Sequence, residues 1–136
     1  MIKEIIKDES FLKKISVPAT ESDLYIATDL LDTLNANKDH CVGLAANMIG
    51  YLKNIIVVDD NGEYLAMINP KIIKFSKPFD TEEACLSLLG TRKTKRYNNI
   101  KLEYQNAKMQ KRIKTFTGFT AQIIQHEIDH CNGIII

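Results

Sequence analysis

Several residue types and features are scarce or missing in this chain of 136 residues. It has no tryptophan and only three cysteines, Cys41, Cys85 and Cys131. An odd, small number of cysteines argues against a disulfide framework, so we expect free thiols. The longest uncharged run, 41–52, has 12 residues, whereas about 20 apolar residues span a bilayer. Because the N-terminal segment mixes charged with apolar residues, it does not resemble a secretory signal, and we expect a cytoplasmic protein without a membrane span.

The chain also lacks an excess of either charge. Eighteen basic and 17 acidic residues leave a formal net charge of +1. No overall field therefore favours nucleic acid or an anionic membrane, and we expect neither as a specific partner. The composition, 45% hydrophobic and 26% charged, is typical of globular proteins, and chains divide only near about 250–300 residues. We expect a single domain that spans residues 1–136.

The pattern of apolar residues predicts a helix near each end of the chain and strands between them. Thr20 and Asp23 have the spacing of a capping box before a helix that runs to about Asn35. A second helix is predicted from about Thr120 to Gly133. Several short, mostly antiparallel strands are predicted at 54–59, 63–69, 71–75, 98–105 and 111–117. A proline between the second and third of these strands is expected to interrupt regular pairing. This order of elements predicts an α+β fold.

The second predicted helix carries an HExxH sequence. His126 and His130 are four residues apart, so both imidazoles can reach one metal ion while Glu127 lies beside an open coordination position. This geometry is typical of metal-assisted hydrolysis. A helix that merely exposes polar residues is the alternative, because so short a pattern also arises by chance.

A catalytic site of this type needs a third protein ligand, and spacing does not select it. The candidates are His40, the three cysteines and the carboxylates. Asp129 and Cys131 are poorly placed because their helical directions diverge from those of the two histidines. A cysteine such as Cys41 or Cys131 is more often a small buried residue than a metal ligand. A histidine such as His40 is more often a solvated loop residue than a metal ligand.

Three segments in the right order resemble the peptide deformylases. They are GLAANMIG at 43–50, EACLS at 83–87 and QHEIDH at 125–130. The resemblance implies an α+β fold in which antiparallel sheets surround a metal-bearing C-terminal helix. It also implies that Cys85, His126 and His130 bind the metal, that Glu127 is the general acid/base, and that the substrate is N-formylmethionine at the start of a nascent chain. The implied ion is Fe²⁺ in the cell, and the donor set also suits Zn²⁺, Ni²⁺ or Co²⁺.

The first of these segments departs from the family pattern. The family stabilises the oxyanion with the backbone N–H after the cysteine, here that of Leu86, and with a glutamine side chain. Met48 stands in the place of that glutamine, and a thioether has no hydrogen to donate. The amide of Asn47, one residue earlier, is expected to point elsewhere. Three further replacements, Cys41 and Ala84 for glycines and Leu89 for a proline, also indicate a diverged member.

Residues that bind substrate are predicted around these segments. Gly43 permits close backbone approach, and Leu44, Leu86 and Ile123 either line a pocket for a methionine-like side chain or belong to the core. Arg92 lies in a stretch that holds peptide in the family, or is one charge of a solvated basic loop at 92–96.

Two alternatives to an active deformylase remain at this point: a catalytically weak paralogue that binds metal and formylated peptides, and a hydrolase of another small amide. Only six residues follow the last proposed ligand, which leaves essentially no room for a C-terminal helical extension that could dock on ribosomes. We therefore expect weak or no stable docking on ribosomes.

Overall fold

A computed structural model describes all residues from Met1 to Ile136. The elements are, in chain order, α1 Glu9–Leu12, a 3₁₀ turn Glu21–Asp23, α2 Leu24–Ala36, β1 Gly43–Ala45, a 3₁₀ turn η2 Ala46–Ile49, β2 Ile55–Asp60, β3 Glu63–Cys85, β4 Leu88–Gln105, β5 Lys111–Thr117 and α3 Gly118–Cys131. The predicted helices match α2 and α3. The capping spacing also has its expected role, because the Thr20 N–H donates to the Asp23 carboxylate at 2.9 Å.

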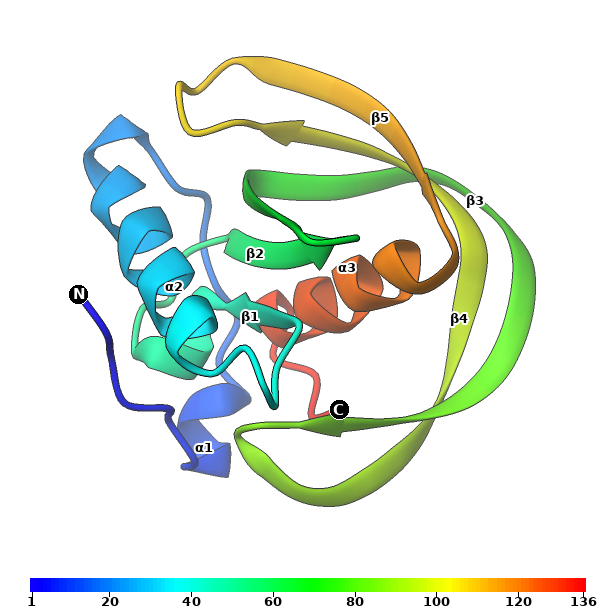
Figure 1. Cartoon of the computed structure of the whole chain (residues 1–136), viewed down its shortest axis with the longest axis horizontal. Coiled ribbons are helices and arrows are strands. Elements are labelled where there is room, and N and C mark those ends of the chain that lie inside the picture. Colours follow the sequence, from blue (N-terminus) through cyan, green and yellow to red (C-terminus); the bar gives the residue numbers. More distant parts are fainter.

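The five strands form one antiparallel sheet in which every strand pairs with the next along the chain, in the order β1-β2-β3-β4-β5. Figure 1 shows the long strands β3 and β4 curving around α3. Helices packed against an antiparallel sheet make this the predicted α+β fold.

The expectation of short strands was wrong for two of the five observed strands, β3 and β4. β3 has 23 residues and β4 has 18, and the predicted strands at 63–69 and 71–75 are parts of β3. The predicted interruption is nevertheless present, because the register shifts between Ile68 and Lys71. Asn69 has φ of 52° there, and Pro70 has no N–H for the ladder. The strand bends at this point instead of ending.

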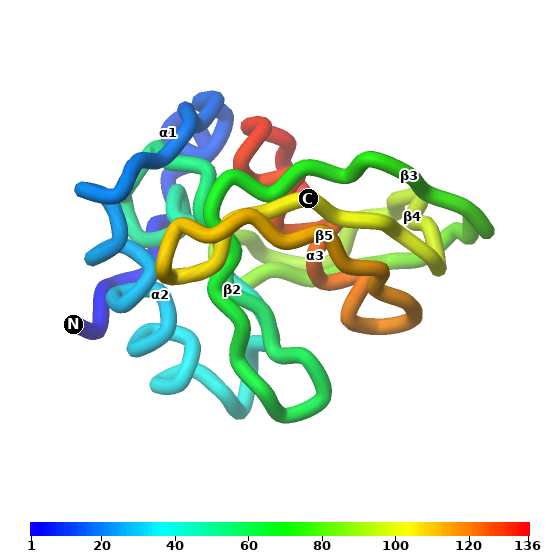
Figure 2. The backbone as a smooth tube through the Cα atoms, turned by 90° about the horizontal axis from the view of Figure 1, so that it is seen from above, coloured from blue at the N-terminus to red at the C-terminus, as the bar shows by residue number.

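The apolar faces of α2 and α3 pack against the sheet in one core. Ile123, Ile124 and Ala121 of α3 are buried together with Ile100 and Leu102 of β4. Figure 2, turned by 90°, shows α2 on one side of the molecule and the bend of β3 and β4 on the other. α3 therefore lies in the interior, where its polar residues need specific partners.

None of the helices combines the length and the apolar content that crossing a membrane requires. The N-terminal segment packs against the C-terminal end of α3. The Ser16 N–H donates to the Cys131 carbonyl at 2.9 Å. A Cβ at Gly133 would stand 2.4 Å from the Lys13 carbonyl oxygen, so only glycine fits where the helix meets this segment.

Candidate metal centre

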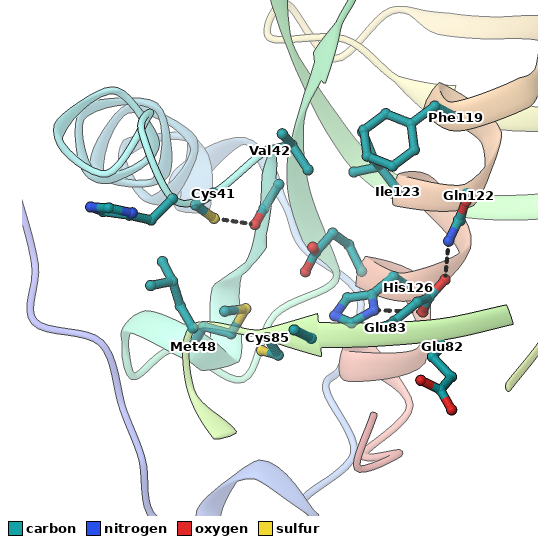
Figure 3. A pocket seen from close by; sticks show the side chains of 15 residues that line it. Cys41, Val42, Met48, Glu82, Glu83, Cys85, Phe119, Gln122, Ile123 and His126 are labelled. Carbon is teal, nitrogen blue, oxygen red and sulfur yellow. Dashed lines mark hydrogen bonds and ion pairs between the residues drawn. The ribbon is translucent and has the colours of Figure 1, made fainter. Parts of the chain in front are cut away.

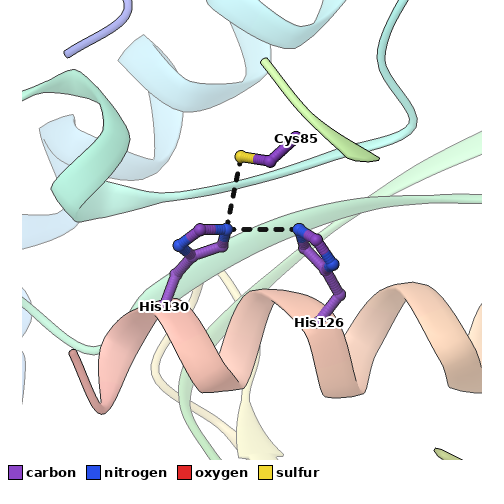
Figure 4. A group of neighbouring side chains, drawn as sticks. All are labelled: Cys85, His126 and His130. Carbon is purple, nitrogen blue, oxygen red and sulfur yellow. Dashed lines mark hydrogen bonds between the residues drawn. The ribbon is translucent and has the colours of Figure 1, made fainter. Parts of the chain in front are cut away.

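Two histidines one turn apart on α3 point to the same spot in the interior. His126 is 7% exposed and His130 is fully buried. Their Nε2 atoms are 3.2 Å apart, as the predicted spacing of four residues on a helix requires. Figure 4 shows both rings facing a cysteine that comes from another element.

That cysteine is Cys85, the last residue of β3 before the turn at 86–87. Its Sγ lies 3.3 Å from the Nε2 of His130, and the three donor atoms lie within 4.8 Å of one another. Nitrogen and sulfur ligands of one tetrahedral ion, at about 2.0–2.3 Å, stand roughly 3.3–3.6 Å apart. The three side chains therefore fit a single divalent ion.

The other candidates for the third ligand are not grouped with the two histidines. His40 is exposed, and Cys131 is buried on the helix away from the cluster. Burial raises the pKa of the Cys41 thiol to about 12, and this thiol donates to the Gly43 carbonyl at 2.9 Å. Only Cys85 joins the two histidines.

A buried ion-pair network binds the Nδ1 of His126, the ring nitrogen opposite to the one that faces His130. The Nδ1 of His126 lies 2.8 Å from Oε1 of Glu83. Arg96 donates to both oxygens of that carboxylate at 2.7–3.2 Å and to Asp129 at 2.7 Å, while Gln122 donates to Glu83 at 2.9 Å. Burial alone would raise the pKa of the Glu83 carboxyl, but hydrogen bonds from three side chains lower it to about 2. Glu83 is therefore an ionised acceptor that orients the imidazole.

This network corrects our interpretation of the basic cluster at 92–96. These residues belong to β4 and not to a solvated loop. They alternate along the strand, so that Lys93 and Lys95 are exposed while Arg92 is half-buried and Arg96 is only 4% exposed. Arg96 points inward because two carboxylates, Glu83 and Asp129, compensate its charge.

Glu127 lies between the two histidines in sequence and is buried. Its residue is 4% exposed, and its Oε1 has no hydrogen-bond partner. Burial raises the pKa of this carboxyl to about 7. A carboxyl group with such a pKa can take up and release a proton near neutrality.

The two imidazoles differ in their protonation. Burial lowers the pKa of His130 to about 3, so this ring is neutral. Burial also opposes a charge on His126, but Cys85 and Glu83 outweigh it and raise the pKa of His126 to about 10.

A cavity of about 230 Å³ opens beside these side chains. Figure 3 shows it between Cys41 and Val42 on one side and Phe119 and Ile123 of α3 on the other. Its lining contains both apolar and polar side chains, and Gln122 is one of the polar ones.

The predicted substrate-binding residues divide into two groups. Gly43, Leu86 and Ile123 line the cavity. A Cβ at Gly43 would stand 2.7 Å from Ile123 Cγ2, so a larger residue would fill the space beside Glu127. Leu44 and Arg92 do not line it. Successive side chains of a strand point to opposite faces, so Leu44 is fully buried in the core.

Arg92 lies further along β4, 3.8 Å from the carboxylate of Glu9. A contact of Arg92 with bound peptide stays a prediction. Leu89, which replaces a proline, is 97% exposed, and Ala84 has no positive φ, so its methyl group causes no backbone strain.

Met48 and Asn47 follow β1 on η2. Met48 is 1% exposed and lines the cavity, and its Sδ accepts a long hydrogen bond of 3.5 Å from the Ala45 N–H. It presents no donor. The Asn47 amide points away from the cavity, as expected, and donates to the His130 carbonyl at 2.9 Å.

Comparison with known proteins gives one consistent result. A sequence model of the polypeptide deformylase family matches residues 2–136. The peptide deformylase of Clostridium beijerinckii is 55% identical over 136 residues, which are 100% of each chain. A class I type b peptide deformylase of Acinetobacter baumannii bound to Met-Ala-Ser aligns with a TM-score of 0.89 at 29% identity, over 99% of this chain and 97% of that chain. Its actinonin-bound structure aligns with a TM-score of 0.88 at 31% identity, over 99% and 95%.

Proposed function

The chain belongs to the polypeptide deformylase family of enzymes, and we propose that it removes the N-formyl group from N-terminal formylmethionine by metal-dependent hydrolysis. The products are formate and a free amino terminus. The observation that carries this proposal is the group of three donor atoms, within 4.8 Å of one another, beside a cavity that also contains Glu127.

Cys85, His126 and His130 would hold one divalent ion. Thiolate and imidazole suit ferrous iron, zinc, cobalt and nickel, and we propose Fe²⁺ for the cell. The bound ion would acidify a water molecule and polarise the formyl carbonyl. Glu83 would hold the His126 ring so that Nε2 is free to bind the ion, because Glu83 binds the opposite ring nitrogen at 2.8 Å.

Glu127 would act as the general acid/base. Its carboxylate takes a proton from the attacking water and returns it to the departing amine nitrogen. Two features support this role: the Oε1 has no partner in the protein, and burial raises its pKa to about 7. Proton transfer in both directions is then close to balanced at neutral pH.

The oxyanion would be stabilised by fewer donors than in the family pattern. The backbone N–H of Leu86, in the turn after Cys85, is the donor that remains. Met48 adds none, and the Asn47 amide is bound to the His130 carbonyl. Loss of one such donor typically lowers turnover about 10²–10³-fold.

Formate release tests the proposal directly. Purified protein loaded anaerobically with Fe²⁺, or with Co²⁺, should release formate from formyl-Met-Ala-Ser. Glu127→Gln should slow release about 10²–10⁴-fold, whereas Glu82→Gln should preserve it, because Glu82 is an exposed residue at the edge of the cavity. Release that is no faster than that of Glu127→Gln would refute the proposed reaction.

Met48 favours a second candidate function, a protein that binds formylated peptides and turns them over slowly. Tight binding of formyl-Met-Ala-Ser without formate release would support it. An acetylated peptide separates both candidates from a hydrolase of other small amides. A site shaped for the hydrogen of a formyl group should reject the acetyl methyl.

A further inference from the structure

The two histidines of the centre are supported unequally. The Nδ1 of His126 is bound by Glu83 at 2.8 Å. The Nδ1 of His130 is buried and has no hydrogen-bond partner in the protein. A histidine that gives its Nε2 lone pair to a metal carries its proton on Nδ1, and that N–H normally has an acceptor.

An unused acceptor lies on a residue that already contacts His130. Asn47 is 1% exposed, and its Nδ2 donates to the His130 carbonyl at 2.9 Å. Its Oδ1 is buried without a partner. The opposite orientation of the amide would set its oxygen against that carbonyl oxygen, so the hydrogen bond itself fixes which atom is the free acceptor.

A lone donor and a lone acceptor thus belong to two residues that are already in contact, because the Asn47 side chain binds the backbone carbonyl of His130. Buried polar groups rarely stay unpaired, because each one keeps the full penalty of desolvation. No direct bond joins the two atoms. A single water molecule can connect an N–H and a carbonyl oxygen in an enclosed polar space.

We propose that Asn47 is the positioning residue of His130: its Oδ1 accepts the Nδ1–H of the ring through one buried water. Asn47 would hold the tautomer in which Nε2 faces Cys85 and His126, as Glu83 does for the other ring. This inference rests on the metal centre of the proposed function. It assigns a task to Asn47 that is separate from oxyanion stabilisation.

Two substitutions separate this task from the bond to the His130 carbonyl. Asn47→Ala removes both the acceptor and the Nδ2 donor. Asn47→Asp keeps an acceptor of the same shape, replaces the donor by an oxygen that faces the His130 carbonyl, and adds a negative charge. Ser16→Ala is the matched control, because Ser16 has another unpaired buried oxygen and its N–H binds α3 at Cys131.

The measurement is metal affinity, obtained by competition between each protein and a chromogenic chelator for Zn²⁺ and for Co²⁺. We expect Asn47→Ala to bind metal about 10- to 100-fold more weakly than the unaltered protein. Asn47→Asp and Ser16→Ala should stay within a few-fold. The d–d spectrum of bound Co²⁺ should change in Asn47→Ala only. Metal-free Asn47→Ala and Asn47→Asp should both melt at a lower temperature, because both lose the bond to the His130 carbonyl.

Three results would overturn the inference. Unchanged metal affinity in folded Asn47→Ala would show that Oδ1 has no effect on His130. Equal losses in Asn47→Ala and Asn47→Asp would assign the effect to the Nδ2 bond. A loss in Ser16→Ala alone would assign the role to Ser16. If the unaltered protein binds no metal, the proposed function fails as well, which none of the other three results implies.

Discussion

Replacing Glu83 by glutamine should destabilise the protein by about 3 kcal/mol. Glu83 and Arg96 have side chains that are only 7% and 5% exposed, so their charges have little water around them. Loss of one partner of a buried pair costs about 3–5 kcal/mol, because the other charge stays buried without compensation. We choose the lower end, because Asp129 still binds Arg96 at 2.7 Å and is 23% exposed.

This cost translates into a large shift of the melting temperature. An unfolding entropy of about 2.1 cal/mol/K per residue gives roughly 0.29 kcal/mol/K for this length, so 3 kcal/mol lowers Tm by about 10 °C. The assays are urea unfolding for the free energy and thermal unfolding for Tm, both at pH 7 with a chelator present and followed by circular dichroism. Glu82→Gln is the control, because this neighbouring carboxylate is exposed and makes no ion pair, and it should change stability by less than about 0.5 kcal/mol.

A double-mutant cycle sharpens the reasoning. Arg96→Met removes the guanidinium, and the double variant removes both charges of the pair. The double variant should be less destabilised than the sum of the single variants, because no charge of the pair is left buried alone. Additive losses, or a loss below about 1 kcal/mol in Glu83→Gln, would refute the view that this pair is buried and coupled.

Other predictions concern the cavity and the metal. Met48→Gln should raise turnover about 10²-fold or more if a missing oxyanion donor limits the rate, with unchanged metal content; an unchanged rate contradicts this. Glu127→Gln should lower kcat about 10²–10⁴-fold while elemental analysis still finds the metal. Gly43→Ala should raise KM or lower kcat, because the new Cβ would stand 2.7 Å from Ile123 Cγ2, and a wild-type kcat/KM would contradict that contact. Cys85→Ser should lose most of its metal in dialysis, which the same elemental analysis checks.

Periodicity predicted the elements that carry the histidines. Residues four apart on a helix must share a face, so the approach of His126 and His130 followed from sequence spacing alone. The third donor did not follow, because Cys85 lies 45 residues before His130, on a strand whose path depends on the bend of β3. Only the resemblance of the EACLS segment selected it.

The buried role of Arg96 was missed although a signal was present. Arg92, Thr94 and Arg96 alternate with two exposed lysines, which is the period of a half-buried strand. The high density of charged residues at 92–96 led us to predict a solvated loop instead of a strand. Burial of Arg96 needs carboxylates from β3 and α3, and which strands and helices meet is a property of the tertiary fold that local pattern does not contain.

The ion pairs of Arg96 also bear on how the protein acquires its metal. Arg96 joins β4 to β3 through Glu83 and to α3 through Asp129, and none of these bonds involves a metal. Together with the apolar face of α3, they hold the two histidines next to Cys85 through contacts within the protein itself. Zinc-finger peptides, in contrast, fold only when their metal binds. We therefore expect metal exchange in this protein to be a local event, in which one ion leaves and another enters without refolding.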